Sequence, residues 1–408
     1  MVSNLLLILI SFLTYLPALS FFFVGDDYGY LTVDKITTPL FVQPTLYHYV
    51  PIPWVILLIV KYFFKTNPFP YHFLVVIIHL INVLLVKKFA KYFFNNEDKW
   101  PFICALLFSL YFANYEVVFW ITGFFIAISL TFYLLAFNFF ARFLHDKKNK
   151  NYWLFIIFYL CSILSHEFGV SLLIFCFVYL LLKKGVKKLK EGVGYFLIPV
   201  IIFGLVSFIK IIGLTVSPFA SPVNLTRWII SVLSFLDYTV YPNPFFWEVI
   251  YQINKLSVLT IISLGLILFG MRKIKGVNLQ IVVIIMISGL FSVTSWPQMR
   301  YLYFLAFSSS LFWTYLLRRI NNKLIITLMI VFLITPQWLF IQARAKEWMK
   351  ASTIAKNVVQ SLSSENVCFL AKNKNYPAAL GNNRWKAYII FHPQPLIKFF
   401  FNKECFFN

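Results

Sequence analysis

Two adjacent carboxylates, Asp26 and Asp27, follow the first apolar run of the chain within the sequence Gly25-Asp26-Asp27-Tyr28. Neighbouring acids at the end of a membrane-length apolar run are costly unless they are paired, hydrated or functional. Because like charges this close raise the pKa of one carboxyl group, the pair can supply a general base beside a hydrogen-bonding partner. Two carboxylates can also ligate a divalent cation. A turn that only ends a helix would use the same residue types.

Further charged residues stand at the ends of later apolar runs. Glu116 lies in the tight turn between two runs, where an acid is either a functional group or a favourable charge at a helix N-terminus. His166 and Glu167 occupy a later turn, where His166 is either a cation that meets phosphate or an ordinary interfacial histidine. Arg300 precedes a late apolar run and is either a phosphate ligand or a headgroup-level anchor.

Histidine and cysteine spacing gives no sign of a metal site. His79 follows His72 by seven residues, so both share one helix face, but two turns separate them by about 10 Å of rise. We therefore expect His79 to hydrogen-bond to a neighbouring helix instead. Of the five cysteines, we expect the three within apolar runs to be small core residues; these are Cys104, Cys161 and Cys176.

The elements that must position these residues are membrane helices. Of the 408 residues, 61% are hydrophobic and only 12% are charged, against about 25% charged in a soluble domain. This composition excludes an ordinary soluble enzyme, a disordered protein and a DNA-binding domain. Apolar runs of membrane length predict about eleven spanning helices. They lie near residues 5–23, 69–86, 101–115, 117–141, 152–165, 167–182, 195–214, 256–271, 278–295, 301–317 and 324–342.

Two features flank these runs. The first run has neither a cationic leader nor a small-residue cleavage site, so we expect a retained helix. It is followed by an outer loop over 24–70, in which the short, proline-bounded apolar segment 51–64 predicts an interfacial or re-entrant helix. After residue 342 the composition becomes mixed, which predicts a transmembrane domain over 1–342 and a small extracytoplasmic region over 343–408. In that region Cys368 and Cys405 either form a disulfide or remain thiols.

The net charge of +22 is explained by topology better than by nucleic-acid binding. With the N-terminus in the cytoplasm, the inner loops hold 19 Lys and Arg, and the outer loops up to the last helix hold six, as the positive-inside rule requires. An odd number of spans then places the C-terminus outside. Half of the acids fall on the outer side, which predicts either an outward-facing polar cavity or ordinary headgroup-level acids. They are Asp26, Asp27, Asp34, Glu116, Glu167, Asp237 and Glu248.

The order of these features resembles the GT-C superfamily of polytopic glycosyltransferases, in particular the protein O-mannosyltransferase-like and lipid A aminoarabinose transferase-like enzymes. The resemblance covers residues 1–185 well and 290–317 weakly. The matching segments are Asp26-Asp27, the run from Tyr47-His48-Tyr49-Val50-Pro51 through Asn67-Pro68 and Tyr71-His72 to His79, Glu116 ahead of Trp120-Ile121-Thr122-Gly123, Ser165-His166-Glu167, and Arg300 to Tyr303. Two departures weaken phosphate binding at neutral pH, because His48 stands near a family Arg and His166 where a Lys is common.

The resemblance implies a GT-C-like helical bundle with chemistry on its outer face. Such enzymes transfer a sugar from a polyprenyl-phosphate carrier, usually with inversion, to a hydroxyl of a lipid, glycan or protein. By this resemblance Asp26 is the base, Asp27 is the alternative base or its hydrogen-bond partner, and Glu116 shapes the acceptor side. The residues expected to bind substrate or phosphate are Arg300, His166, Glu167, His48 and Tyr28. We expect no metal requirement, since cationic side chains can hold the leaving phosphate; a divalent cation is the alternative.

The expected partners are the polyprenyl-phosphate sugar donor, the lipid, glycan or protein acceptor and the bilayer, with no nucleic acid. The expected location is the cytoplasmic membrane, as a multi-pass protein. Two other classes of function stay open: a transporter or flippase of a lipid-linked sugar, and a non-catalytic GT-C-like membrane protein. The chain shows no pair of related halves of the kind that many transporters have.

Overall fold

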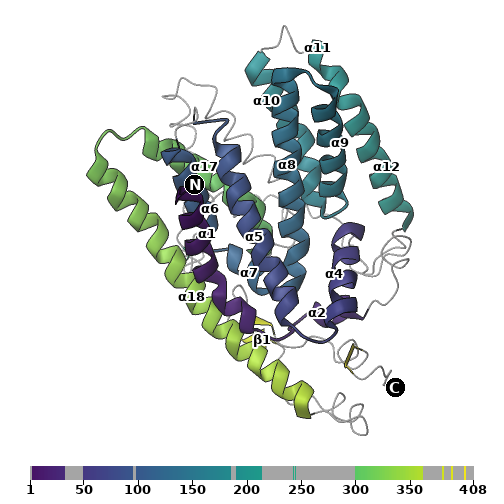
Figure 1. Ribbon diagram of the computed structural model, residues 1–408, viewed down its shortest axis with the longest axis vertical. Helices are drawn as coiled ribbons and strands as arrows, with labels where there is room; N and C mark the ends of the chain where they lie inside the picture. The colour runs from purple at the N-terminus through teal and green to yellow at the C-terminus, as the bar shows by residue number, and fades with distance from the viewer. Residues whose placement is uncertain are drawn as a thin grey trace, which may run out of the picture.

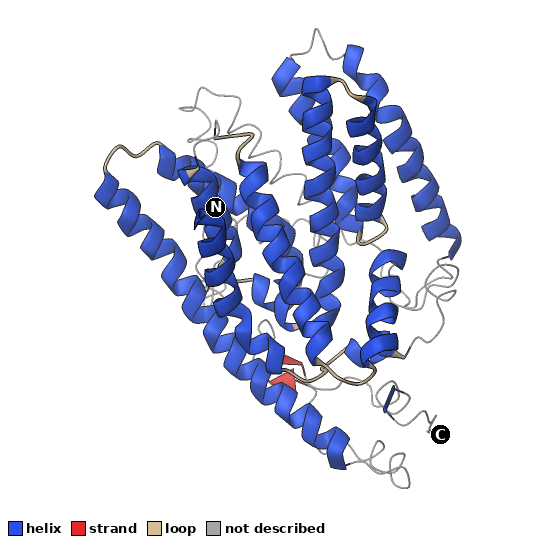
Figure 2. Cartoon of the chain, in the orientation of Figure 1, coloured by secondary structure: helices blue, strands red, loops and turns tan. Residues whose placement is uncertain are grey.

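The computed structural model describes residues 2–32, 49–94, 98–184, 190–213, 242, 244, 299–361, 379–380, 387–388 and 399–400. Within these ranges the chain is helical apart from two short paired strands (Figure 2). The α-helices are α1 (Val2–Tyr15), α2 (Asp27–Leu31), α4 (Pro51–Phe64), α5 (Phe69–Ala90), α6 (Lys99–Ser109), α7 (Asn114–Phe119), α8 (Phe124–Asp146), α9 (Asn149–Ile163), α10 (Ser171–Lys184), α11 (Lys190–Val193), α12 (Leu197–Gly213), α17 (Leu302–Arg318) and α18 (Lys323–Ser361). The 3-10 helices are η1 (Leu16–Ser20), η2 (Ile121–Gly123), η3 (Glu167–Val170), η5 (Gly194–Phe196) and η6 (Met299–Tyr301), and the strands are β1 (Ala379–Leu380) and β2 (Ala387–Tyr388).

A bundle of long helices forms the body of the molecule (Figure 1). Helix α5 packs against α6 and α8, α17 packs against α6, and α9 packs along α8. Four of these helices bring phenylalanine rings together, with centroid distances of 4.6 Å between Phe89 and Phe137 and 4.9 Å between Phe137 and Phe175. Phe307 of α17 lies 5.7 Å from Phe89. Such rings bury a large apolar area, and Phe307 meets Phe89 edge to face, which fixes the helices against one another.

The protein is a membrane protein. Four helical segments of the described chain are long and apolar enough to cross a bilayer: Val2–Ser20, Phe69–Ala90, Ile121–Asp146 and Lys323–Ser361. Their outward faces carry large apolar side chains that stay exposed, among them Leu9 on α1 (51%) and Phe332 on α18 (67%). Apolar faces of this extent are stable against lipid chains and not against water.

The described helices follow most of the apolar runs, and the segment 51–64 is the separate helix α4. Prolines at its first turn fit its start, because the missing N–H would have no helical partner there. Several sequence-based predictions lie outside the described residues. They concern the runs 256–271 and 278–295, the acids Asp34, Asp237 and Glu248, and His48, Cys368 and Cys405.

Two helix boundaries differ from those that the composition predicts. The helix expected to run from residue 117 is interrupted. Helix α7 ends at Phe119, and η2 intervenes before α8 begins at Phe124. The last apolar run, 324–342, lies within a longer helix, because α18 continues to Ser361 over 39 residues. The segment after residue 342 keeps good helix formers, mainly Ala and Lys, and the helix continues although the composition changes.

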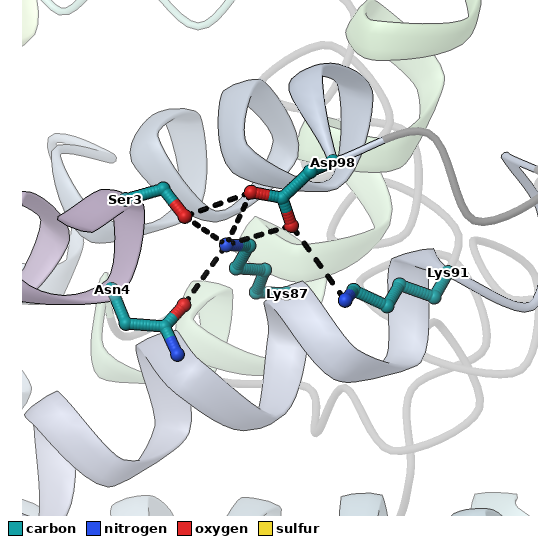
Figure 3. A network of polar contacts seen from close by, with 5 residues as sticks. All are labelled: Ser3, Asn4, Lys87, Lys91 and Asp98. Atoms are coloured by element: carbon teal, nitrogen blue, oxygen red, sulfur yellow. Dashed lines mark hydrogen bonds and ion pairs between the residues drawn. The ribbon is translucent and has the colours of Figure 1, made fainter. Parts of the chain in front are cut away.

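A polar cluster joins α1, α5 and α6 at one end of the bundle (Figure 3). The Lys87 ammonium, which is almost fully buried, donates hydrogen bonds to Ser3 Oγ (2.7 Å) and Asn4 Oδ1 (2.9 Å) and pairs with Asp98 at 3.0 Å. Asp98 also pairs with Lys91 at 3.6 Å. Hydrogen bonds from Ser3 and Lys87 hold the pKa of Asp98 down at about 2. This end of the bundle is therefore the cationic end.

His79, inside α5, is hydrogen-bonded to a neighbouring helix as expected. Its Nδ1 lies 2.9 Å from the Tyr303 hydroxyl of α17. The same hydroxyl accepts a hydrogen bond from Asn82 Nδ2 at 3.1 Å, and Asn82 also donates to the Ala127 carbonyl of α8 at 2.8 Å. Polar links of this kind hold helices together where no water is available.

Candidate active site

The acidic pair is placed by a turn that needs a glycine. Gly25 has a φ of 57°, in the left-handed region that a residue without a Cβ adopts at little cost. The turn leads directly into α2. Asp26 immediately precedes this helix, and Asp27 is its first residue. Carboxylates are favourable at a helix N-terminus. Both acids are therefore held at the start of α2, just beyond the end of η1.

The two acids have different surroundings. Asp26 is partly exposed, whereas Asp27 is fully buried and its Oδ2 accepts a hydrogen bond from the Val24 N–H at 3.0 Å. Burial raises the pKa of Asp27 well above its usual range, although the Val24 and Thr122 backbones and the Trp120 side chain oppose this shift. The other oxygen, Oδ1, makes no hydrogen bond of good geometry with a described group. Burial therefore favours the protonated form of Asp27, whereas Asp26 keeps contact with solvent.

Glu116 lies in the short helix α7 and is 4% exposed. Burial raises the pKa of this carboxyl group to about 7, and the charge and the backbone N–H of Arg300 oppose the rise. Helix α7 packs against η6, the element that carries Arg300. The acid and the arginine, which are far apart in the sequence, therefore belong to one site.

Arg300 itself is held over aromatic rings. Its Cζ lies 4.7 Å from the ring centroid of Trp120 and 5.8 Å from that of Tyr301, within the range of a cation–π interaction. Burial lowers the pKa of Arg300, but Tyr301, Glu116, Tyr30 and Asp26 raise it more strongly. The guanidinium therefore stays charged within a group of acids and hydroxyls.

A second glycine brings Trp120 and Glu116 into this arrangement. A Cβ on Gly123 would stand 2.2 Å from the Val117 carbonyl oxygen and 2.6 Å from its Cα. No side chain can be accommodated there, because the contact is with backbone. Gly123 thus allows η2 to fold directly against α7, with Trp120 between them.

His166 and Glu167 border the site from another side. His166 Nδ1 lies 3.4 Å from Glu167 Oε2 and, at the same distance, accepts a hydrogen bond from the Phe168 N–H. The His166 ring centroid is 6.1 Å from that of Tyr301, the residue after Arg300. His166 is therefore beside the element that carries Arg300.

Tyr28 has a different place from the one expected for a substrate contact. It is 1% exposed, and its hydroxyl donates a hydrogen bond to the Phe23 carbonyl at 2.6 Å. Its ring packs near Phe23 and Phe400. In this structure Tyr28 stabilises the turn that holds the acidic pair.

The acidic pair lies at the end of the bundle opposite the Lys87 cluster. Helix α5 starts at Phe69, next to α4, and reaches Lys87 after most of its 22 residues, which corresponds to about 30 Å of rise. Helix α2, which begins at Asp27, lies beside α4 at the start of α5, and the Lys87–Asp98 pair lies near the end of α5 (Figure 1).

The arrangement can carry out acid–base chemistry beside a bound anion. A partly exposed carboxylate, Asp26, can accept a proton, and Arg300 can hold a negatively charged group nearby. Within the described ranges no three His, Cys, Asp or Glu side chains are grouped so as to hold a metal ion. Sequence reasoning missed the role of Trp120 as the platform for Arg300; the only signal was an aromatic residue between Glu116 and a glycine.

No protein-family model matches the chain, and no curated protein sequence matches it significantly. Two solved structures are similar. Archaeal oligosaccharyltransferase AglB from Archaeoglobus fulgidus, in complex with an inhibitory peptide and a dolichol-phosphate, has a TM-score of 0.51 and 14% identity over 93% of this chain and 60% of AglB. ArnT from Cupriavidus metallidurans, bound to undecaprenyl phosphate, has a TM-score of 0.49 and 12% identity over 87% of this chain and 72% of ArnT. The likeness to AglB shows a shared fold, in agreement with the GT-C resemblance of the sequence.

Proposed function

We propose that this protein is a membrane glycosyltransferase that takes a sugar from a polyprenyl-phosphate donor and transfers it to a hydroxyl of a lipid, glycan or protein. The observation that carries the proposal is the electrostatic interaction of the Arg300 guanidinium with both Glu116 and Asp26. A base and a fixed cation are what displacement of a phosphate from a sugar requires. AglB, whose fold this chain shares, is an oligosaccharyltransferase solved with a dolichol-phosphate.

In the proposed reaction the acceptor oxygen attacks the anomeric carbon while its proton passes to the Asp26 carboxylate. The bond between the anomeric carbon and the phosphate oxygen breaks, and the leaving polyprenyl phosphate takes the electron pair. Attack from the side opposite the leaving group inverts the anomeric centre. Asp27 positions Asp26 by fixing the turn through its bond to the Val24 N–H.

Arg300 stabilises the charge that develops on the leaving phosphate, because a guanidinium offers several donors to phosphate oxygens. His166 also stabilises the leaving phosphate when the imidazole is protonated. Glu167, at 3.4 Å, orients the His166 ring. Glu116 shapes the acceptor side. With these cations no metal is required, so treatment with EDTA is expected to leave the rate unchanged. A loss of activity that Mg²⁺ or Mn²⁺ restores would instead indicate a divalent cation.

We further propose that the site faces the extracytoplasmic side, with α4 at the membrane interface and the Lys87 cluster facing the cytoplasm. The positive-inside distribution of the loops supports this orientation. Cysteine labelling with a membrane-impermeant reagent tests it. A cysteine at Asn67, between α4 and α5, should react in intact cells, and a cysteine at Asn149, at the start of α9, should not.

The experiment that tests the function uses the full chain in lipid nanodiscs with a panel of polyprenyl-phosphate hexoses and pentoses. The expected result is release of polyprenyl phosphate from at least one donor when an acceptor lipid extract or glycoprotein fraction is present. Deletion of the gene in its own host should remove the sugar of that donor from the corresponding glycan. A flippase would give the contrary pattern, with donor lipid moved across liposomes and no polyprenyl phosphate released.

A further inference from the structure

The part of α18 beyond residue 342 carries a fully buried tryptophan that the proposed reaction does not use. Trp348 is 0% exposed, and its ring centroid lies 6.2 Å from that of Trp120 and 6.3 Å from that of Phe119. Small buried residues on the same face, Ala345 and Ala351, allow this stretch of helix to approach the site closely. Trp348 is therefore a large side chain through which α18 contacts the site.

Trp120 connects this contact to Arg300. The Arg300 guanidinium carbon is 4.7 Å from the Trp120 ring centroid, and Trp348 packs on the same indole at an interplanar angle of 54°. A cation–π interaction depends on the position of the ring face below the cation. A neighbour that restricts rotation of the indole consequently restricts where the guanidinium can lie.

Helix α18 is itself anchored well enough to serve as a support. Gln342 Nε2 donates to the Thr14 carbonyl of α1 at 3.1 Å, and Ser352 Oγ accepts from the Phe22 N–H at 2.5 Å. Gln337 Oε1 accepts from the Phe112 N–H at 3.0 Å, in the turn that leads into α7. Side chains on both sides of Trp348 thus tie α18 to the elements that carry the acids.

We propose that Trp348 is a positioning residue that holds Trp120 in place, so that the Arg300 guanidinium is fixed where it meets the phosphate of the polyprenyl carrier. This inference rests on the proposed function, because it assigns Arg300 to that phosphate. It adds a dependence of phosphate binding on the C-terminal helix, which neither the composition of the segment nor the location of the acids indicates.

The test measures binding of undecaprenyl phosphate to the full chain in nanodiscs, with wild type, Trp348→Ala, Arg300→Gln and the double variant. Removing the guanidinium should weaken binding by about 10-fold to 100-fold, the range for a hydrogen bond to a charged group. Trp348→Ala should weaken it by about 2-fold to 10-fold. In the Arg300→Gln background the same Trp348→Ala change should have no effect, because nothing remains to be positioned.

Two controls separate positioning from folding. Trp348→Phe keeps a ring against Trp120 and should restore most of the affinity. Trp338→Ala removes a tryptophan from the same helix that is 42% exposed, and should leave the dissociation constant within about twofold of wild type. Loss of folded protein lowers the number of binding sites per protein and not the dissociation constant of those that remain, so the two quantities are fitted separately.

The outcomes distinguish this inference from the proposed function. If Arg300→Gln weakens binding while Trp348→Ala does not, or if the two effects simply add, the positioning role is wrong and the proposed function stands. If wild type does not bind undecaprenyl phosphate, or if Arg300→Gln binds as wild type does, the assignment of Arg300 to phosphate fails, and the role of Trp348 fails with it.

Discussion

The backbone N–H of Arg300 donates a hydrogen bond to the buried carboxyl group of Glu116, and the guanidinium of the same residue lowers the pKa of that group against the effect of burial. The acid and the arginine come from separate short elements, α7 and η6, which lie at the start of different long helices. Their contact thus fixes the relative position of two parts of the bundle. It also places the Arg300 guanidinium where it interacts with Asp26.

The close packing at Gly123 can be tested directly. Gly123→Ala should reduce both thermal stability and undecaprenyl phosphate binding, because its Cβ would stand 2.2 Å from the Val117 carbonyl oxygen and force α7 away from η2. Such overpacking typically costs about 1–3 kcal/mol. Differential scanning fluorimetry and the binding assay give the two values. Gly204→Ala, at an open site on α12, is the matched control and should be neutral or slightly stabilising; equal effects of the two changes would contradict the packing argument.

Glu116 should make stability depend on pH. Because burial raises its pKa to about 7, the folded protein keeps a proton that the unfolded chain loses near pH ~4. The protonated Glu116 carboxyl group makes its full contribution to folding stability below the pKa of the unfolded chain, near pH ~4. This contribution is lost as the pH rises through about 7. Glu116→Gln, which cannot ionise, should therefore gain stability relative to wild type between about pH 5 and about pH 8, by up to about 3 kcal/mol.

The measurement is the midpoint of thermal unfolding as a function of pH for wild type and Glu116→Gln. Glu167→Gln serves as the control, since its carboxylate is 36% exposed and the substitution should leave the shape of the curve unchanged. Parallel curves for wild type and Glu116→Gln would show that Glu116 does not titrate in this range.

The proposed contact between His166 and phosphate predicts that phosphate binding depends on pH. A histidine is only partly charged at neutral pH, and a lysine stays charged. His166→Lys should therefore bind undecaprenyl phosphate more tightly than wild type at about pH 8, by about threefold or more, and the difference should shrink at about pH 5.5. His145→Lys, at the exposed end of α8, should have no such effect. An unchanged affinity of His166→Lys at the higher pH would remove His166 from the phosphate site.

The order of the charged residues along the chain and the family resemblance predict that Asp26, Glu116 and Arg300 belong together, and in the structure Arg300 interacts with both acids. Their outer position remains a prediction from the count of Lys and Arg in the loops. The burial of Asp27 was not predictable, because it depends on Trp120 and Thr122 of a distant segment. Two acids adjacent in the sequence thus acquire different surroundings from the fold, one fully buried and one partly exposed.

The last helix extends well beyond the apolar run 324–342. Lysines and asparagines appear after residue 342, and this change in composition predicts a separate region over 343–408. Helix α18 continues nonetheless, because Ala, Lys, Met and Gln all favour a helix whether or not lipid surrounds it. The change in composition after residue 342 therefore gives no sign that Trp348 packs on Trp120.

The Lys87 cluster should stabilise the fold without contributing to the reaction. Lys87→Met leaves Ser3, Asn4 and Asp98 without a shared donor (Figure 3), and loss of a hydrogen-bonded charge of this kind costs about 1–3 kcal/mol. Lys91→Met, whose side chain is 42% exposed, should cost much less. Both variants should keep wild-type affinity for undecaprenyl phosphate below their unfolding temperatures. A selective loss of affinity in Lys87→Met would show that this end of the bundle contacts the ligand.

The central claim is that Asp26 accepts the proton of the acceptor hydroxyl during sugar transfer. The most direct measurement is the rate of polyprenyl phosphate release in nanodiscs for wild type, Asp26→Asn and Asp27→Asn, with the exposed Asp146→Asn at the other end of the bundle as control. We predict that Asp26→Asn lowers the rate by about 10²-fold to 10⁴-fold, the usual contribution of a general base, while Asp146→Asn transfers sugar normally. A wild-type rate in Asp26→Asn would contradict the account, whatever the rate of Asp27→Asn.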